Sequence, residues 1–261
     1  RHQQTLASRK KLLGGQHPET ADNYSDIGNT LLAEGKAAEA IEWYEKALSV
    51  QEGALGREHR NVAAVCYNIG ESYRRPGKKL SEALRWHQRA VEVYEKALGQ
   101  EHPSTALSYA AMGRTLSQQG NGAKALEWLG KAVAIQEKVL GNVHPTTSDS
   151  YSAMAAVYNQ MGKYAEALTW TQKALEAKEK VFGPEHETVG VAYDNIGTLY
   201  LKQRKNVEAL ESFEKSLHIL EAAYGKEHPK AQSAYNGIRT LCSKQHHKPS
   251  CAFVKSREKK K

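Results

Sequence analysis

Hydrophobic and small residues recur with helical spacing in two runs between Tyr193 and Ser216. The first run follows the i, i+3, i+4, i+7 pattern of one helix face, and the second follows i, i+4, i+7. The polar connector Lys202–Asn206 separates them, so the stretch predicts two helices joined by a short turn. One such hairpin cannot bury its own apolar faces and needs copies of itself alongside. The positions are Tyr193, Ile196, Gly197 and Tyr200 in the first run and Ala209, Phe213 and Ser216 in the second.

Copies of this hairpin recur along the chain. Six histidines, each three residues after a glycine, are spaced by 42 residues, apart from one interval of 43. They are His17, His59, His102, His144, His186 and His228. The apolar pattern of both helices recurs between them, which predicts an all-α fold: a right-handed superhelical solenoid of stacked helix hairpins.

The repeat divides the chain into three parts. Residues 1–15 read as the end of a truncated preceding repeat, whose first helix lies upstream. Residues 16–244 hold five complete repeats and a terminal helix. Residues 245–261 form a basic tail without a helical stripe, which we expect to be disordered. The five repeats are expected at about 18–56, 60–99, 103–141, 145–183 and 187–225.

The order of residues within each unit resembles the tetratricopeptide repeat, whose usual period is 34 residues. The longer unit of this chain carries Leu-Gly-x-Glu-His-Pro between repeats, as in Leu98–Pro103. In this it is similar to the kinesin light chains and the nephrocystin-3-like proteins. The resemblance implies a concave groove, lined by the first helices, that binds a peptide or helix of a protein partner. It also implies kinesin heavy chain as a partner, through a region outside this chain.

Charge and cysteine content favour a protein partner in the cytoplasm. The net charge is +8, but residues 1–15 hold four basic residues and no acid, and residues 243–261 hold seven basic residues against Glu258. The repeats themselves are nearly neutral, so the basic balance does not indicate nucleic acid. Three cysteines make no disulfide framework, which fits a reducing compartment. No apolar run is long enough for a membrane span.

None of the reactive side chains forms a convincing catalytic, metal or cofactor site, and we expect no enzyme. The repeat histidines are about one helix layer apart, too far to share a metal, and favour a role at helix starts. Gly190 stands where a zinc protease motif beginning at His186 needs its second ligand. The Gly120–Ala125 segment lacks the preceding strand of a dinucleotide site. Cys242, His246, His247 and Cys251 have ligand chemistry for zinc but no common zinc spacing, so a buried Cys242 is the favoured alternative.

Four tryptophans occupy the same position of successive second helices. Their place at the flank of the buried stripe indicates half-buried packing between successive second helices. The alternative is an aromatic row on the convex face for a partner. The residues are Trp43, Trp86, Trp128 and Trp170.

The candidate binding residues are polar positions of the first helices that face the predicted groove. Amide side chains can donate to and accept from a peptide backbone. In kinesin light chains an asparagine on the first helix helps to hold cargo peptides; Asn68 and Asn195 match its place, whereas Asp26, Ala111 and Ala153 do not. Arginines at the end of the second repeat's first helix and on the next repeat predict an acidic peptide. The alternative is that they are solvated or pair with neighbouring glutamates. The predicted peptide-binding residues are Asn29, Asn68, Arg74, Arg75, Arg114, Asn159, Asn195 and Lys202.

These features predict a protein-binding scaffold, with a kinesin-light-chain-like cargo adaptor as the best class. One alternative is a cytoskeletal or ciliary scaffold without a motor. The other is the regulatory repeat domain of an enzyme whose catalytic part lies outside this chain.

Overall fold

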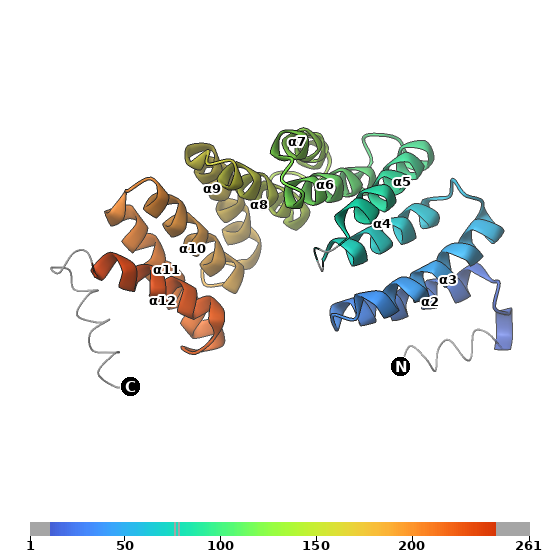
Figure 1. The fold of residues 1–261 in the computed structure, drawn as a ribbon, viewed down its shortest axis with the longest axis horizontal. Helices are drawn as coiled ribbons and strands as arrows, with labels where there is room; N and C mark the ends of the chain where they lie inside the picture. Colours follow the sequence, from blue (N-terminus) through green and yellow to red (C-terminus); the bar gives the residue numbers. More distant parts are fainter. Residues whose placement is uncertain (1–10, 76, 78, 244–261) are drawn as a thin grey trace. The chain divides into compact units, whose positions relative to one another are not determined.

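The fold is entirely helical over the residues that the structure, a computed structural model, describes: 11–75, 77 and 79–243 (Figure 1). The expectations for residues 1–10 and for the tail 245–261 lie outside this part. The longer helices are α2 (Pro18–Ala33), α3 (Ala37–Leu55), α4 (Arg60–Arg74), α5 (Leu80–Leu98), α6 (Pro103–Gln118), α7 (Gly122–Val139), α8 (Pro145–Gln160), α9 (Tyr164–Phe182), α10 (Glu187–Lys202), α11 (Asn206–Tyr224) and α12 (Pro229–Cys242).

The helices form two compact units, with α2–α7 in residues 1–139 and α8–α12 in residues 140–261. In the first unit, α2 packs against α3, α4 against α5 and α6 against α7; α3 also contacts α4, and α5 contacts α6. The second unit repeats this arrangement with α8–α9 and α10–α11, and α12 covers α11. Each unit is therefore a stack of helix hairpins, which confirms the predicted solenoid class.

Six first helices begin at the repeat histidines. In each case the histidine is the N-cap residue, and its Nδ1 accepts a hydrogen bond from the backbone N–H two residues further on, at 3.1–3.3 Å. This bond satisfies one of the N–H groups that a helix start leaves unpaired. A proline occupies the first turn of α2, α6, α8 and α12, where the missing N–H costs nothing. The predicted role of these histidines at helix starts is confirmed.

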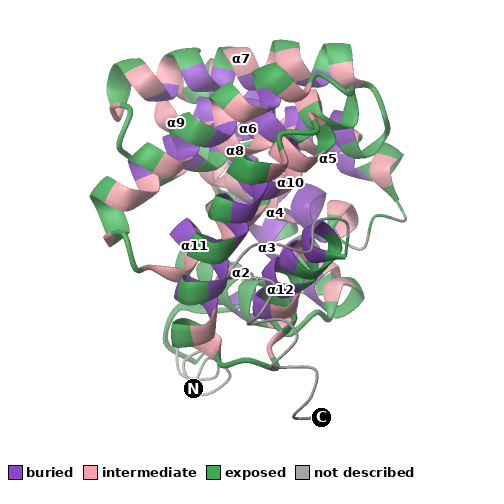
Figure 2. Ribbon diagram, turned by 90° about the vertical axis from the view of Figure 1, so that its left-hand side faces the viewer, coloured by how far each residue is buried: buried purple, intermediate pink, exposed green. Residues whose placement is uncertain are grey.

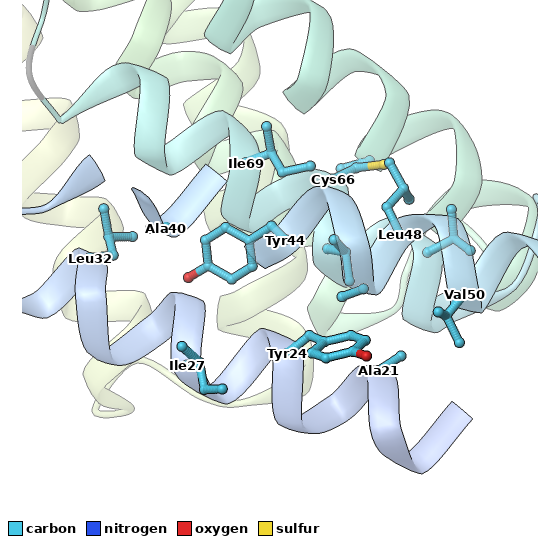
Figure 3. Packing of buried hydrophobic residues seen from close by; sticks show 14 residues of the cluster. Ala21, Tyr24, Ile27, Leu32, Ala40, Tyr44, Leu48, Val50, Cys66 and Ile69 are labelled. Carbon is cyan, nitrogen blue, oxygen red and sulfur yellow. The ribbon is translucent and has the colours of Figure 1, made fainter. Parts of the chain in front are cut away.

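Burial follows the faces that the sequence pattern predicts (Figure 2). In the first repeat, Figure 3 shows Tyr44 of α3 between Tyr24 and Ile27 of α2 and residues of α4, among them Ile69. The hydroxyl of Tyr44 reaches the edge of the core and donates a hydrogen bond to Asn29 Oδ1 at 2.7 Å.

A glycine on the first helix faces a large residue on the second in four of the five repeats. A Cβ atom on Gly28 would lie 2.6 Å from the ring of Tyr44, and one on Gly197 would lie 2.7 Å from the ring of Phe213. Real Cβ atoms do not approach so closely, so only glycine lets the large side chain fill this space. The four pairs are Gly28 with Tyr44, Gly70 with His87, Gly113 with Leu129 and Gly197 with Phe213. The fourth repeat has Ala155 and Thr171 at these positions instead.

The tryptophans are half-buried, as predicted. Each of three packs against a tyrosine on the first helix of its own repeat, with ring centroids 5.4–5.8 Å apart. The outer ring face carries a lysine from the next helical turn, such as Lys46 over Trp43 at 4.4 Å. The three pairs are Tyr24–Trp43, Tyr109–Trp128 and Tyr151–Trp170.

Replacing the first glycine should therefore destabilise the first unit. Gly28→Ala places a methyl group against the rigid Tyr44 ring, and such overpacking costs about 1–3 kcal/mol. The matched control is Gly53→Ala in α3, where the new Cβ meets nothing within 4 Å. That control should be neutral or stabilising by up to about 1 kcal/mol, because alanine favours helix more than glycine does. Urea denaturation followed by circular dichroism measures both, and equal effects of the two changes would contradict the packing described.

Candidate functional site

Polar residues of the first unit's first helices form a continuous surface on α2, α4 and α6. Asn29 Oδ1 accepts hydrogen bonds from the Tyr44 hydroxyl and, at 3.4 Å, from Asn68 Nδ2. The second half of this surface, further along α4, is formed by arginines around one glutamate. We call the whole set the arginine surface: Asn29, Asn68, Glu71, Arg74, Arg75 and Arg114.

Glu71 is the centre of the arginine surface. Its side chain is only 8% exposed, and Arg74 donates two hydrogen bonds to its carboxylate, at 2.8 and 2.7 Å. Arg114 of α6 lies 3.9 Å from one carboxylate oxygen, and Arg75 lies 4.0 Å from the other. Burial by itself would raise the pKa of Glu71, but the hydrogen bonds and charge of Arg74, with the charge of Arg114, lower it below its ordinary value. Glu71 is therefore ionised and holds the arginines together.

His87 of α5 lies buried beneath the arginine surface, next to Glu71. It is fully buried, its Nε2 lies 3.6 Å from the Glu71 carboxylate, and neither ring nitrogen has a hydrogen-bond partner among the described residues. Burial lowers the pKa of His87 to about 4, against the opposing attraction of Glu71. The imidazole is neutral near pH 7 and leaves the charge balance to Glu71 and the arginines.

The arginine surface has a surplus of positive charge that faces outward. Three guanidinium groups surround one carboxylate, and His87 adds no charge. Arg74 is committed to Glu71 and only 15% exposed, whereas Arg75 is 55% exposed and Arg114 25% exposed. The alternative expectation, that these arginines pair with a neighbouring glutamate, is thus met by all three: Arg74 is hydrogen-bonded to Glu71, and Arg75 and Arg114 pair with it at 4.0 and 3.9 Å. Arg75 and Arg114 keep N–H donors that an external carboxylate can reach.

The second unit holds the remaining predicted residues. Asn159 of α8 and Asn195 of α10 line one cavity, whereas Lys202 is exposed at the end of α10 and does not line it. The structure thus brings together Asn159 with Asn195, and Asn29 and Asn68 with the three arginines. Lys178 of α9 also lines the cavity and was missed, because its position carries the core side chains Gln51, Gln136 and Leu220 in other repeats. The charge of Lys178, at a position that is uncharged in those repeats, was the feature of the sequence that could have indicated it.

The structure offers no candidate metal centre in the part it describes: no three His, Cys, Asp or Glu side chains gather there. The zinc alternative included His246, His247 and Cys251, which lie outside the described residues. Cys242 is buried in the core of the second unit, as favoured. Among the described helices, none is long and apolar enough to cross a membrane.

Overlapping matches to the tetratricopeptide repeat cover residues 1–53, 23–96, 63–138, 112–180 and 146–222. The chain belongs to the tetratricopeptide repeat family. This family agrees with the one that the repeat spacing and the packed helix hairpins indicate.

Known proteins similar to this tetratricopeptide chain include kinesin light chain types. Protein KINESIN LIGHT CHAIN-RELATED 1 of Arabidopsis thaliana is 37% identical over 73 residues, which is 28% of this chain and only 12% of that protein. The crystal structure of nearly identical tetratricopeptide-like repeats of a Podosopora anserina kinesin light chain has a TM-score of 0.67 at 25% identity, covering 80% of this chain and 98% of that one. A Rap protein complexed with competence and sporulation factor has the same fold, with a TM-score of 0.64 at 14% identity over 95% of this chain and 80% of its own.

The buried histidine should make the first unit sensitive to acid. The pKa of His87 is about 4 in the folded protein and about 6.5 in an unfolded chain. Because the folded value is the lower one, this contribution to stability is complete above pH 6.5 and is lost as the pH falls toward 4. The loss amounts to about 3 kcal/mol. His87→Leu, with the residue that the third repeat has at this position, should remove it.

Urea denaturation of the chain and of the His87→Leu variant at pH 7.0, 5.5 and 4.5 measures this difference. The variant should lose less stability between pH 7.0 and 4.5 than the unchanged chain. The hydrogen bonds and charge of Arg74 keep the pKa of Glu71 low in both proteins, so the difference between the two profiles reports mainly on His87. Parallel pH profiles would show that His87 is not a buried neutral group.

Proposed function

We propose that this chain is a protein-binding scaffold of the kinesin-light-chain-like type, which holds an acidic segment of a partner on the arginine surface. The observation that carries the proposal is the surplus positive charge of Arg75 and Arg114 beside a shared, buried Glu71. A fixed carboxylate orients the arginines before any partner arrives, so less side-chain freedom is lost on binding.

The asparagines complete a site for an extended peptide. Asn29 uses its side-chain oxygen within the protein, which leaves its amide N–H groups and the side-chain oxygen of Asn68 for a peptide. Side-chain amides can satisfy the N–H and C=O groups of a peptide backbone, and the arginines can then select acidic side chains. Binding by similar repeats has a precedent in the Rap protein complexed with competence and sporulation factor.

The relatives favour a cargo adaptor within the class of binding scaffolds. The similarity to kinesin light chain repeats supports this role, with kinesin heavy chain bound through a region outside this chain and the adaptor acting in the cytoplasm near the cytoskeleton. A non-catalytic role is in keeping with the usual function of the family.

A charge reversal at the most exposed arginine tests the proposal. We expect Arg75→Glu to weaken binding of a fluorescein-labelled acidic peptide, acetyl-(Ala-Glu)5-amide, at least tenfold, which corresponds to about 1.4 kcal/mol. Arg75 is the preferred residue because its replacement leaves the Glu71–Arg74 hydrogen bonds in place. Fluorescence anisotropy at fixed ionic strength measures the affinity.

The matched control is Arg57→Glu, which changes an 83% exposed arginine outside the arginine surface by the same charge. It should bind the acidic peptide as the unchanged chain does, and in both of these proteins the glutamine version of the peptide should bind more weakly, whereas Arg75→Glu should reduce this preference. An equal loss of affinity in both variants would show that only the net charge of the chain matters. If the unchanged chain did not prefer the glutamate peptide, the proposed site would be contradicted.

A further inference from the structure

A cavity of about 130 Å³ lies within the second unit, between α8, α9 and α10. Engineered cavities of about 150 Å³ in other proteins admit a molecule as large as benzene, so this volume suffices for one small side chain or acid. Unlike those apolar cavities, it is lined by polar groups from all three helices. The polar lining consists of Ser152, Asn159, Thr171, Lys178, Asn195 and Thr198.

The cavity has its origin in the contact that the other repeats fill. The second helix has Tyr44, His87, Leu129 and Phe213 at the position that carries Thr171 in the fourth repeat. Thr171 is shorter than all of these, and its hydroxyl is used within α9, where it donates to the carbonyl of Ala167 at 2.8 Å. The opposing Ala155 adds only one methyl group in place of glycine, so the space is not restored.

Lys178 places a positive charge at this cavity. Its Nζ donates a hydrogen bond to Ser152 Oγ at 3.2 Å, and no carboxylate among the described residues lies within ion-pair distance of it. Burial lowers the pKa of Lys178. The negative charge of Asp149 opposes this effect and raises the pKa in part. An ammonium group has three N–H donors, so two remain after the bond to Ser152.

The position of Lys178 carries no charge in any other complete repeat. The equivalent residues are Gln51, Tyr94, Gln136 and Leu220, all of which are buried. A cation that is partly withdrawn from water without a charged partner costs free energy, which an arriving anion recovers. The rim is accessible, because Asn159 and Asn195 are exposed and can donate amide N–H groups to the same anion.

We propose that this cavity, the Lys178 pocket, binds a single carboxylate group. The Nζ of Lys178 pairs with the carboxylate, the amides of Asn159 and Asn195 donate at the rim, and the space left by Thr171 holds the carbon chain. The group belongs to an acidic side chain, a peptide C-terminus or a small free acid, which share this chemistry. The Lys178 pocket has no residue in common with the arginine surface, and the proposal does not rest on it.

Binding of small probes to the isotope-labelled chain tests the proposal. Sodium acetate should shift the side-chain amide NMR signals of Asn159 and Asn195 saturably at constant ionic strength, and neutral acetamide should bind at least tenfold more weakly. Lys178→Met should weaken acetate binding at least tenfold. The matched control is Lys180→Met, because Lys180 lies on the same helix but is 56% exposed and pairs with Glu176. It should leave acetate binding unchanged.

A second variant separates the cavity from the charge. Thr171→Leu combined with Ala155→Gly, which together give the Gly113–Leu129 pair of the third repeat, should fill the space and abolish acetate binding while Lys178 stays in place. Non-saturable shifts, equal affinity for acetate and acetamide, or undiminished binding by Lys178→Met would each overturn the proposal. Arg75→Glu should not affect acetate binding, so failure here is distinguishable from failure of the arginine surface.

Two peptides identify the source of the carboxylate. Acetyl-Ala-Glu-Ala-amide carries it on a side chain, and acetyl-Ala-Ala-Ala with a free C-terminus carries it at the chain end. Preferential binding of the first, relative to acetate, supports an internal acidic residue as the ligand, and preferential binding of the second supports a C-terminus. Binding of acetate alone supports a small free acid.

Discussion

The close contact between the first and second helix of each repeat is the interaction on which the rest of this structure depends. A glycine on one helix admits a large side chain from the other, and no Cβ atom would fit between them in four repeats. Where the large residue also reaches the next first helix, the same side chain ties one repeat to its neighbour. In the fifth repeat, Phe213 lies against both Gly197 and Gly237 in this way. Packing at native density makes such contacts intolerant of one extra methyl group.

The arginine surface and the Lys178 pocket both lie where the second helix has no large apolar residue at this contact. In the second repeat the large residue is His87, whose imidazole lies beneath Glu71 and thereby beneath the arginine surface. In the fourth repeat it is Thr171, which leaves the space that Lys178 and the asparagines line. In both cases one exchange in a repeated contact gives a single repeat a chemistry that its neighbours lack. The repeat supplies the scaffold, and its irregular members supply the binding groups.

The sequence was sufficient to predict the helices, because their spacing recurs and each first helix begins at a histidine that caps it. It also placed Arg74, Arg75 and Arg114 close together, since all three belong to the C-terminal half of adjacent first helices or follow it directly. It could not divide the roles of these arginines, because the bidentate bond of Arg74 to Glu71 depends on side-chain geometry within α4. Lys178 was missed for a related reason. A cavity is set by the volumes of several helices, and the pattern of one helix marks Lys178 only as a core position.

The helix contact itself can be tested by a double-mutant cycle in the fourth repeat. Thr171→Phe alone should destabilise the chain, because the ring meets the methyl group of Ala155. Ala155→Gly should cost about 1 kcal/mol through helix propensity. Together the two changes reproduce the Gly197–Phe213 pair, so the double variant should be more stable than the sum of the single effects predicts, by at least about 1 kcal/mol. Additive effects in urea denaturation would contradict the account, because they would show that the glycine is not what admits the large side chain.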